Sequence, residues 1–179
     1  MSKNLKLSLA LVVAAVAAAF IAAAASSDDG DTAAEDGPGG ESAVMVRDDS
    51  RRLSTGSSDV VFVEFLDFEC EACRAAFPAV EELRQTYGDR VSFVVRNFPL
   101  HANSMAAARA AEAAAEQGAF EEMYVKLFET QPEWGERSDS QEDVFFGFAE
   151  DLGLDMEEFR AVYDDPATVA KIERDQADG

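Results

Sequence analysis

The sequence VEFLDFECEACRAAFP, from Val63 to Pro78, contains both cysteines of the chain, Cys70 and Cys73, with two residues between them. The overlapping stretch VVFVEFLDF at 60–68 is β-branched and aromatic, which is typical of a strand buried on both faces. Helical periodicity begins near Cys70 and continues well past the second cysteine. The pattern therefore predicts a strand that leads directly into a helix, with Cys70 at the helix start and Cys73 one turn further on.

A second apolar stretch, VSFVV at 91–95, follows the helix and predicts another buried strand. A strand, a helix and a strand with short links form a βαβ unit, in which the two strands are parallel. We place this unit at residues 59–101. A short edge strand is expected before it, in AVMV near 43–46. From 102 to 179 the apolar periodicity is helical, so this part is predicted to consist of helices.

Two cysteines at this spacing point to redox chemistry. A sulfur at a helix N-terminus faces unpaired N–H groups and the positive end of the helix dipole, which stabilise a thiolate. The thiolate attacks disulfides, and a second nearby thiol resolves the mixed disulfide. A purely structural disulfide would contribute little to stability across so small a ring. Inert buried thiols and a metal site compete with the redox pair, but two cysteines and one histidine are too few for the usual four metal ligands.

Glu64 lies in the middle of the first predicted strand, six residues before Cys70. Its side chain is expected to point beneath the helix start, toward Cys73. A buried carboxyl with a raised pKa could carry a proton to or from the resolving thiol. The alternative is that strand alternation turns Glu64 to solvent.

These residues resemble the active-site segment of the DsbA-like thiol–disulfide oxidoreductases of the thioredoxin superfamily. The shared features are a buried strand with an acid six residues before the C-x-x-C, an aromatic residue two before it, and a proline five residues after its second cysteine. The resemblance implies that Cys70 is the nucleophile, Cys73 the resolving thiol and Glu64 the buried acid. It also implies that Pro78 is the proline that kinks the active-site helix.

The later sequence VRNFPLHANSMAAARAAEAA, at 95–114, is similar to the second strand, the F-P-L turn and the first inserted helix of this family. The resemblance implies an α/β, thioredoxin-like fold with a helical domain inserted at 102–179. That fold completes its sheet with a hairpin, a last helix and a cis-proline loop. Because the last proline, Pro166, falls at a predicted helix start and Gly179 is still in helical pattern, we expect the final strands, helix and loop to be missing.

The dipeptide between the cysteines, Glu71-Ala72, departs from the family pattern. By the resemblance, strongly oxidising members carry a histidine here that helps to hold the thiolate. The carboxylate of Glu71 is expected to disfavour the anion instead, so we expect a weaker oxidant. His101 follows the F-P-L turn, where helix entry or a surface position is expected rather than catalysis, and Trp134 is either a substrate contact or a packed anchor.

The N-terminal residues form a separate region. Two lysines precede an apolar run at 7–25, which at ~1.5 Å per residue is ~28 Å long and close to the thickness of a bilayer core. Small residues at its end also suit a signal peptidase, so residues 1–25 are expected to be a cleaved signal peptide or a membrane anchor. Residues 26–58 are predicted to be a flexible acidic linker. The chain is thus predicted to be extracytoplasmic, and anchored to the plasma membrane by 7–25 if uncleaved.

The composition limits the partners. The formal net charge is −21, which argues against nucleic acid or anionic lipid. No metal or organic cofactor is expected, because the redox group would be the Cys70–Cys73 disulfide itself. The expected partners are unfolded or reduced exported proteins and a membrane redox partner that resets the disulfide.

The function favoured by these observations is disulfide exchange with exported proteins through the C-E-A-C motif. One alternative within enzymes is a disulfide reductase or isomerase that works with the pair reduced. Another is a non-catalytic binding or chaperone module, which the expected absence of the cis-proline loop makes credible.

Overall fold

The computed structural model describes residues 44–179. The apolar run at 7–25 and the first part of the linker, 26–43, lie outside these residues, so the expected signal peptide or anchor stays a prediction. Within residues 44–179, none of the helices is both long and apolar enough to cross a membrane.

The described chain contains a three-stranded mixed sheet with the strand order β1-β3-β2. Strand β2 (Val61–Leu66) and strand β3 (Ser92–Asn97) are parallel, and Glu64 lies opposite Val95 in their register. Helix α2 (Glu71–Tyr87) connects them. The predicted βαβ unit is therefore confirmed. It delivers the chain from the end of β2 to the start of α2, where both cysteines lie.

The edge strand does not lie where the sequence predicted it. Residues 44–46 are not in a strand, whereas Arg51–Ser54, expected to be linker, forms β1 and pairs antiparallel with β3. The prediction was wrong because it relied on apolar residues, whereas salt bridges help to hold this strand. Arg51 makes salt bridges of 2.7 Å to Glu112 and 2.8 Å to Glu116 on the helical side.

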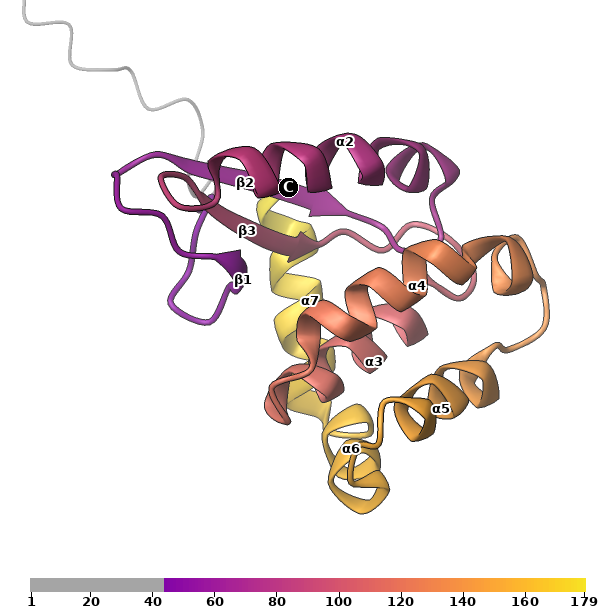
Figure 1. Cartoon of the computed structure of the whole chain (residues 1–179). Coiled ribbons are helices and arrows are strands. Elements are labelled where there is room, and N and C mark those ends of the chain that lie inside the picture. The colour runs from indigo at the N-terminus through magenta and orange to yellow at the C-terminus, as the bar shows by residue number, and fades with distance from the viewer. Residues whose placement is uncertain (1–43) are drawn as a thin grey trace, which may run out of the picture. The chain divides into compact units, whose positions relative to one another are not determined.

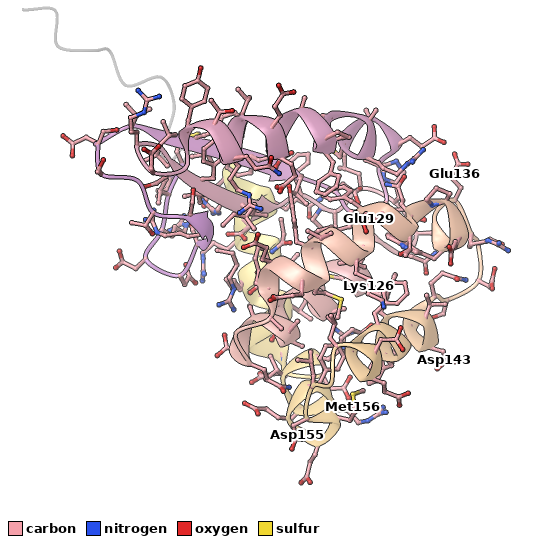
Figure 2. The ribbon with its side chains drawn as sticks, in the orientation of Figure 1. Lys126, Glu129, Glu136, Asp143, Asp155 and Met156 are labelled. Atoms are coloured by element: carbon pink, nitrogen blue, oxygen red, sulfur yellow. The ribbon has the colours of Figure 1, made fainter. Side chains whose placement is uncertain are left out.

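Five helices follow the sheet strands along the chain. They are α3 (Ser104–Glu116), α4 (Phe120–Trp134), α5 (Glu142–Asp151), α6 (Met156–Tyr163) and α7 (Pro166–Asp178). Helix α3 contacts each of the other four, and its buried alanines let them approach closely. The side chain of Asp155, labelled in Figure 2, caps α6 by accepting hydrogen bonds from the N–H groups of Glu157 and Glu158.

Aromatic packing joins the sheet to the helical part behind the cysteines. The ring of Phe68, just after β2, lies 5.3 Å from that of Phe128 and 6.1 Å from that of Tyr124, both on α4. Phe77 of α2 stacks on Phe128 at 5.2 Å. The rings of Phe68, Tyr124 and Phe128 are almost fully buried. This cluster fixes α2 and the preceding loop against α4, and so holds the cysteines on a rigid base.

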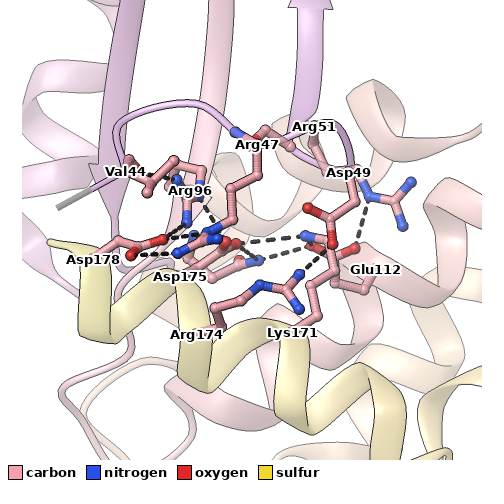
Figure 3. Close-up of polar contacts among 12 residues, drawn as sticks. Val44, Arg47, Asp49, Arg51, Arg96, Glu112, Lys171, Arg174, Asp175 and Asp178 are labelled. Atoms are coloured by element: carbon pink, nitrogen blue, oxygen red, sulfur yellow. Dashed lines mark hydrogen bonds and ion pairs between the residues drawn. The ribbon is translucent and has the colours of Figure 1, made fainter. Parts of the chain in front are cut away.

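Helices α2 and α7 lie on opposite sides of the sheet (Figure 1). Helix α7 is fastened to β3 by buried charges (Figure 3). Arg96 is fully buried and lies 2.6 Å from Asp175 and 2.5 Å from Asp178, and its guanidinium also donates to the carbonyl groups of Val44 and Met45. The last helix of the segment 102–179 therefore covers the sheet, while α3 to α6 form the helical part beside it.

Candidate active site

Cys70 is the N-cap residue of α2, with an extended backbone at φ −72° and ψ 121°. Its N–H donates to the carbonyl of Asp67 at 3.2 Å, and its own carbonyl accepts from the N–H of Arg74 at 3.0 Å. Cys73 follows one turn into the helix. Both cysteines are half-buried and are free thiols in this structure. The sequence prediction of a thiol at the helix start, with its partner one turn away, describes this geometry.

The two thiols lie in different surroundings. Burial raises the pKa of the Cys73 thiol to about 11. A hydrogen bond from the Asp67 backbone acts in the opposite direction, while the neighbouring Cys70 and the charge of Asp67 raise the pKa further. Cys73 therefore holds its proton at neutral pH. This suits a thiol that does not react with the substrate itself while Cys70 does.

Glu64 is half-buried on β2, and burial raises the pKa of its carboxyl to about 7. The hydroxyl of Tyr124 donates to its Oε2 at 3.5 Å, which lowers the pKa in part, and the charge of Glu81 raises it. A carboxyl that titrates near neutral pH can give and take a proton under physiological conditions. The structure thus places Glu64 beside Tyr124 of α4. Its role toward Cys73 stays a prediction.

Asp67 is a residue near the dithiol that sequence reasoning did not single out. It is 3% exposed and accepts hydrogen bonds from the N–H groups of Glu69 at 2.8 Å and Leu100 at 2.9 Å. Its Oδ2 also lies 2.6 Å from Nδ1 of His101. His101, expected only at a helix entry or on the surface, thus pairs with a buried acid beside the cysteines. The signal available in the sequence was an acid three residues before Cys70.

Two buried polar side chains hold the loop before α2. Gln131 of α4 donates to the carbonyl of Phe68 at 2.8 Å and to that of Cys70 at 3.0 Å. The carboxylate of Glu69 accepts from the N–H of Asn103 at 2.6 Å and from that of Glu136 at 3.1 Å. Glu69 therefore ties the active-site loop to the starts of α3 and of the loop after α4. The sequence did not predict either role, because each depends on partners far away along the chain.

The remaining predicted residues lie on or beside α2. Glu71 is exposed in the first turn of the helix, and Pro78 lies inside it. Glu71 also lines a small hollow of about 170 Å³ together with Arg74 and residues at the end of α4. Trp134, left open by the sequence, is fully buried and packs edge-on against Phe145 at 4.8 Å, so it is a packed anchor.

Among residues 44–179, no group of three or more histidine, cysteine or acidic side chains is arranged to hold a metal ion.

A profile of the thioredoxin family matches residues 51–179, which include both cysteines and the whole of the sheet. The chain belongs to the thioredoxin family. Among solved structures of this family, a thioredoxin-like oxidoreductase from Silicibacter pomeroyi DSS-3 is 31% identical, with a TM-score of 0.60 over 72% of this chain and 70% of that chain. BdbD from Bacillus subtilis is 25% identical, with a TM-score of 0.58 over 70% of this chain and 71% of that chain.

Solved structures of DsbA proteins share the fold of this chain. The alpha-DsbA1 protein from Wolbachia pipientis matches with a TM-score of 0.63 over 74% of this chain and 68% of that chain. Its 18% identity bears on the fold alone. The resemblance to DsbA-like proteins, predicted from the active-site segment, is therefore confirmed at the level of the fold.

Curated relatives include much longer proteins. A Na(+)/H(+) antiporter NhaA from Herminiimonas arsenicoxydans is 38% identical over 120 residues, which are 67% of this chain and 18% of that protein. NhaA 1 from Mycobacterium sp. (strain KMS) is 39% identical over 129 residues, which are 68% of this chain and 20% of that protein. This thioredoxin-family chain thus spans about a fifth of the length of the curated relatives that it matches.

Proposed function

We propose that this chain is a thiol–disulfide oxidoreductase that exchanges disulfides with other proteins through Cys70 and Cys73. The observation that carries the proposal is the position of Cys70 as the N-cap of α2, where the helix N-terminus favours a thiolate. The half-buried Cys73, one turn further on, is the proposed thiol that resolves a mixed disulfide.

The reaction begins when a substrate thiolate attacks the Cys70 sulfur of the Cys70–Cys73 disulfide. A bond forms between the substrate sulfur and Cys70, the bond between the two cysteines breaks, and Cys73 leaves as a thiolate. A second substrate thiolate then attacks the substrate sulfur and releases Cys70. The substrate dithiol is oxidised to a disulfide, and the protein disulfide is reduced to two thiols.

The leaving Cys73 needs a proton, because its thiol has a pKa raised to about 11. Glu64, whose carboxyl has a pKa raised to about 7, is the proposed source of that proton near neutral pH. In the reverse direction the carboxylate would take the proton back as Cys73 attacks Cys70. Tyr124, which donates to Glu64, is proposed to hold the carboxyl in place.

The proposed substrates are unfolded or reduced proteins outside the cytoplasm, with a membrane partner that resets the disulfide. Support comes from the charge asymmetry around the apolar run at 7–25, with lysines before it and an acidic stretch after it. An impermeant thiol reagent should label Cys70 in intact cells. Labelling only after lysis would contradict export.

The function is tested with the oxidised full chain and a reduced peptide that carries two cysteines. One equivalent of protein should oxidise one equivalent of peptide, with the Cys70→Ala variant inactive. A peptide that stays reduced would contradict disulfide exchange and favour a binding module. Redox equilibrium with glutathione then separates an oxidant from the alternative of a reductase or isomerase, because only the latter works with the pair mostly reduced.

A further inference from the structure

The Asp67 carboxylate is buried and lies beside the dithiol. It is 3% exposed, and its two oxygens accept the backbone N–H groups of Glu69 and Leu100. A buried carboxylate kept ionised needs such donors, and it acts strongly on neighbouring groups because little water screens its charge. The residue is therefore well placed to influence the chemistry of its neighbours.

The backbone of Asp67 contacts both cysteines. Its carbonyl accepts from the N–H of Cys70 at 3.2 Å, and its backbone makes a hydrogen bond with the thiol of Cys73. The carboxylate charge of Asp67 is also one of the causes that raise the pKa of Cys73. When Cys73 leaves as a thiolate, two negative charges consequently come to lie close together.

His101 contacts this acid from a different element. It lies in the turn between β3 and α3, its side chain is 47% exposed, and its Nδ1 is 2.6 Å from Oδ2 of Asp67. The hydrogen bond to Asp67 raises the pKa of His101, and the charges of Asp67, Glu69 and Glu136 raise it further. His101 lines a hollow of about 380 Å³ together with Glu136 and Arg137.

We propose that His101 is a positioning residue for disulfide exchange: its positive charge offsets the Asp67 carboxylate and thereby eases the departure of Cys73 as a thiolate. This inference rests on the proposed function. The covalent step is the one described above, in which the Cys70–Cys73 bond breaks and a bond between Cys70 and the attacking sulfur forms. His101 forms no bond in that step and acts only through Asp67.

The proposal gives the exchange reaction a pH dependence. With His101 protonated, the Asp67–His101 pair is neutral and opposes the new thiolate least. As the pH rises through the pKa of His101, the ring loses its charge and leaves the carboxylate of Asp67 uncompensated. Glu69 and Glu136 also face the ring, and Cys70 also faces Cys73, but none of these supplies a positive charge in its place.

The competing explanation is that the pair only ties the loop before α2 to the turn before α3. A neutral ring that carries its proton on Nδ1 still donates to Asp67, so loss of a tie of this kind in His101→Gln would slow the reaction at both pH values. The charge of His101 can be removed or made permanent without touching the core, since nearly half of the side chain is exposed.

The test measures how fast 2-mercaptoethanol reduces the oxidised full chain at pH 5.5 and pH 8.5. This uncharged thiol provides the same thiolate concentration for every variant at a given pH. We expect His101→Gln to react about 3–10-fold more slowly than the wild type at pH 5.5, because the substitution removes a nearby positive charge. At pH 8.5, where the wild-type ring has lost that charge, the two rates should match. His101→Lys should match the wild type at pH 5.5 and exceed it at pH 8.5.

Arg137→Gln is the matched control, because it removes a cation from the same hollow that does not pair with Asp67. It should change the rate less than about twofold at either pH. A His101→Gln/wild-type ratio that is the same at both pH values, or a failure of His101→Lys to restore the rate, would overturn the proposal. A chain that reacts with 2-mercaptoethanol but not with a dithiol peptide would instead contradict the proposed function.

A second measurement needs no His101 variant. His101 is the single histidine of the chain, so its titration can be followed by NMR without ambiguity. In a Glu64→Gln background, which removes a carboxyl whose pKa is raised to about 7, the rate per thiolate should fall with rising pH at the midpoint measured for His101. A rate that stays level through that midpoint would contradict the proposal.

Discussion

Nε of Arg96 lies 2.6 Å from Oδ1 of Asp175, and both side chains are almost fully buried between β3 and α7. Two charges taken out of water are stable only when each is well paired. Around them Lys171 pairs with Glu112 at 2.6 Å, and Arg47 pairs with Asp178 at 2.6 Å (Figure 3). This network joins the helical segment to the sheet against which α2 and its two cysteines pack.

We predict that Arg96→Met lowers the free energy of unfolding by about 3–5 kcal/mol, because the buried Asp175 loses its guanidinium partner and its remaining ion pair, to Lys171, is longer at 3.4 Å. Chemical denaturation followed by circular dichroism measures the effect. The control is Asp151→Asn, which breaks the exposed salt bridge to Lys126 and should change stability by less than about 1 kcal/mol. Equal effects of the two substitutions would show that the buried network does not fasten α7.

A second prediction concerns Glu64. The carboxyl has a pKa of about 7 in the folded chain, against an ordinary value of 4.5, so the folded state binds the proton more tightly than the unfolded state. The free energy of unfolding should therefore fall as the pH rises from about 4.5 to about 7, by roughly 3 kcal/mol in total. Glu64→Gln should remove this loss and be the more stable protein at pH 8.

Denaturation curves at pH 4.5 and pH 8 for the wild type and Glu64→Gln test this point. The exposed Glu82→Gln on α2 is the control, and it should follow the wild type at both pH values. If Glu64→Gln and the wild type lose the same stability between the two pH values, the carboxyl is not the group responsible.

A third prediction concerns the support of the loop before α2. Gln131→Leu removes the donor to the carbonyls of Phe68 and Cys70 and leaves both without that partner. We expect a loss of about 1–3 kcal/mol in stability and slower disulfide exchange, since the cap position of Cys70 becomes less fixed. Stopped-flow reduction and denaturation measure the two effects. Glu129→Gln, on the exposed side of the same helix, should change neither (Figure 2).

A fourth prediction concerns the dipeptide between the cysteines. Glu71 is exposed in the first turn of α2, next to Cys70. Glu71→His should favour the thiolate and make the pair a stronger oxidant, by about 30 mV for each tenfold change in the redox equilibrium. Equilibration with glutathione checks this, with Glu71→Gln to separate loss of the carboxylate from gain of the imidazole. An unchanged or more reducing potential would show that Glu71 does not weaken the oxidant.

The part of the fold that the sequence predicted well is local. The strand that contains Glu64, the helix that begins after Cys70 and their parallel return strand follow from apolar periodicity and from helix-end signals within a short stretch. The same stretch also carries the resemblance to DsbA-like proteins, so the position of the two cysteines could be predicted.

The parts that the sequence did not predict depend on contacts between distant residues. Strand β1 begins with two arginines and is held partly by salt bridges to α3, so apolar periodicity does not predict it. The Asp67–His101 pair joins residues 34 positions apart, and neither stretch of sequence shows that the two side chains meet. Covering of the sheet by α7 likewise depends on the buried pairing of Arg96 with Asp175.

The central claim is that Cys70 is the exchanging thiol and Cys73 the resolving one. Trapping of mixed disulfides tests it most directly, with Cys73→Ala and Cys70→Ala variants incubated with a protein substrate and separated by non-reducing electrophoresis. Cys73→Ala should accumulate a substrate adduct through Cys70, because no second thiol releases it, while Cys70→Ala should accumulate little. Equal trapping by both variants, or stronger trapping by Cys70→Ala, would contradict the account.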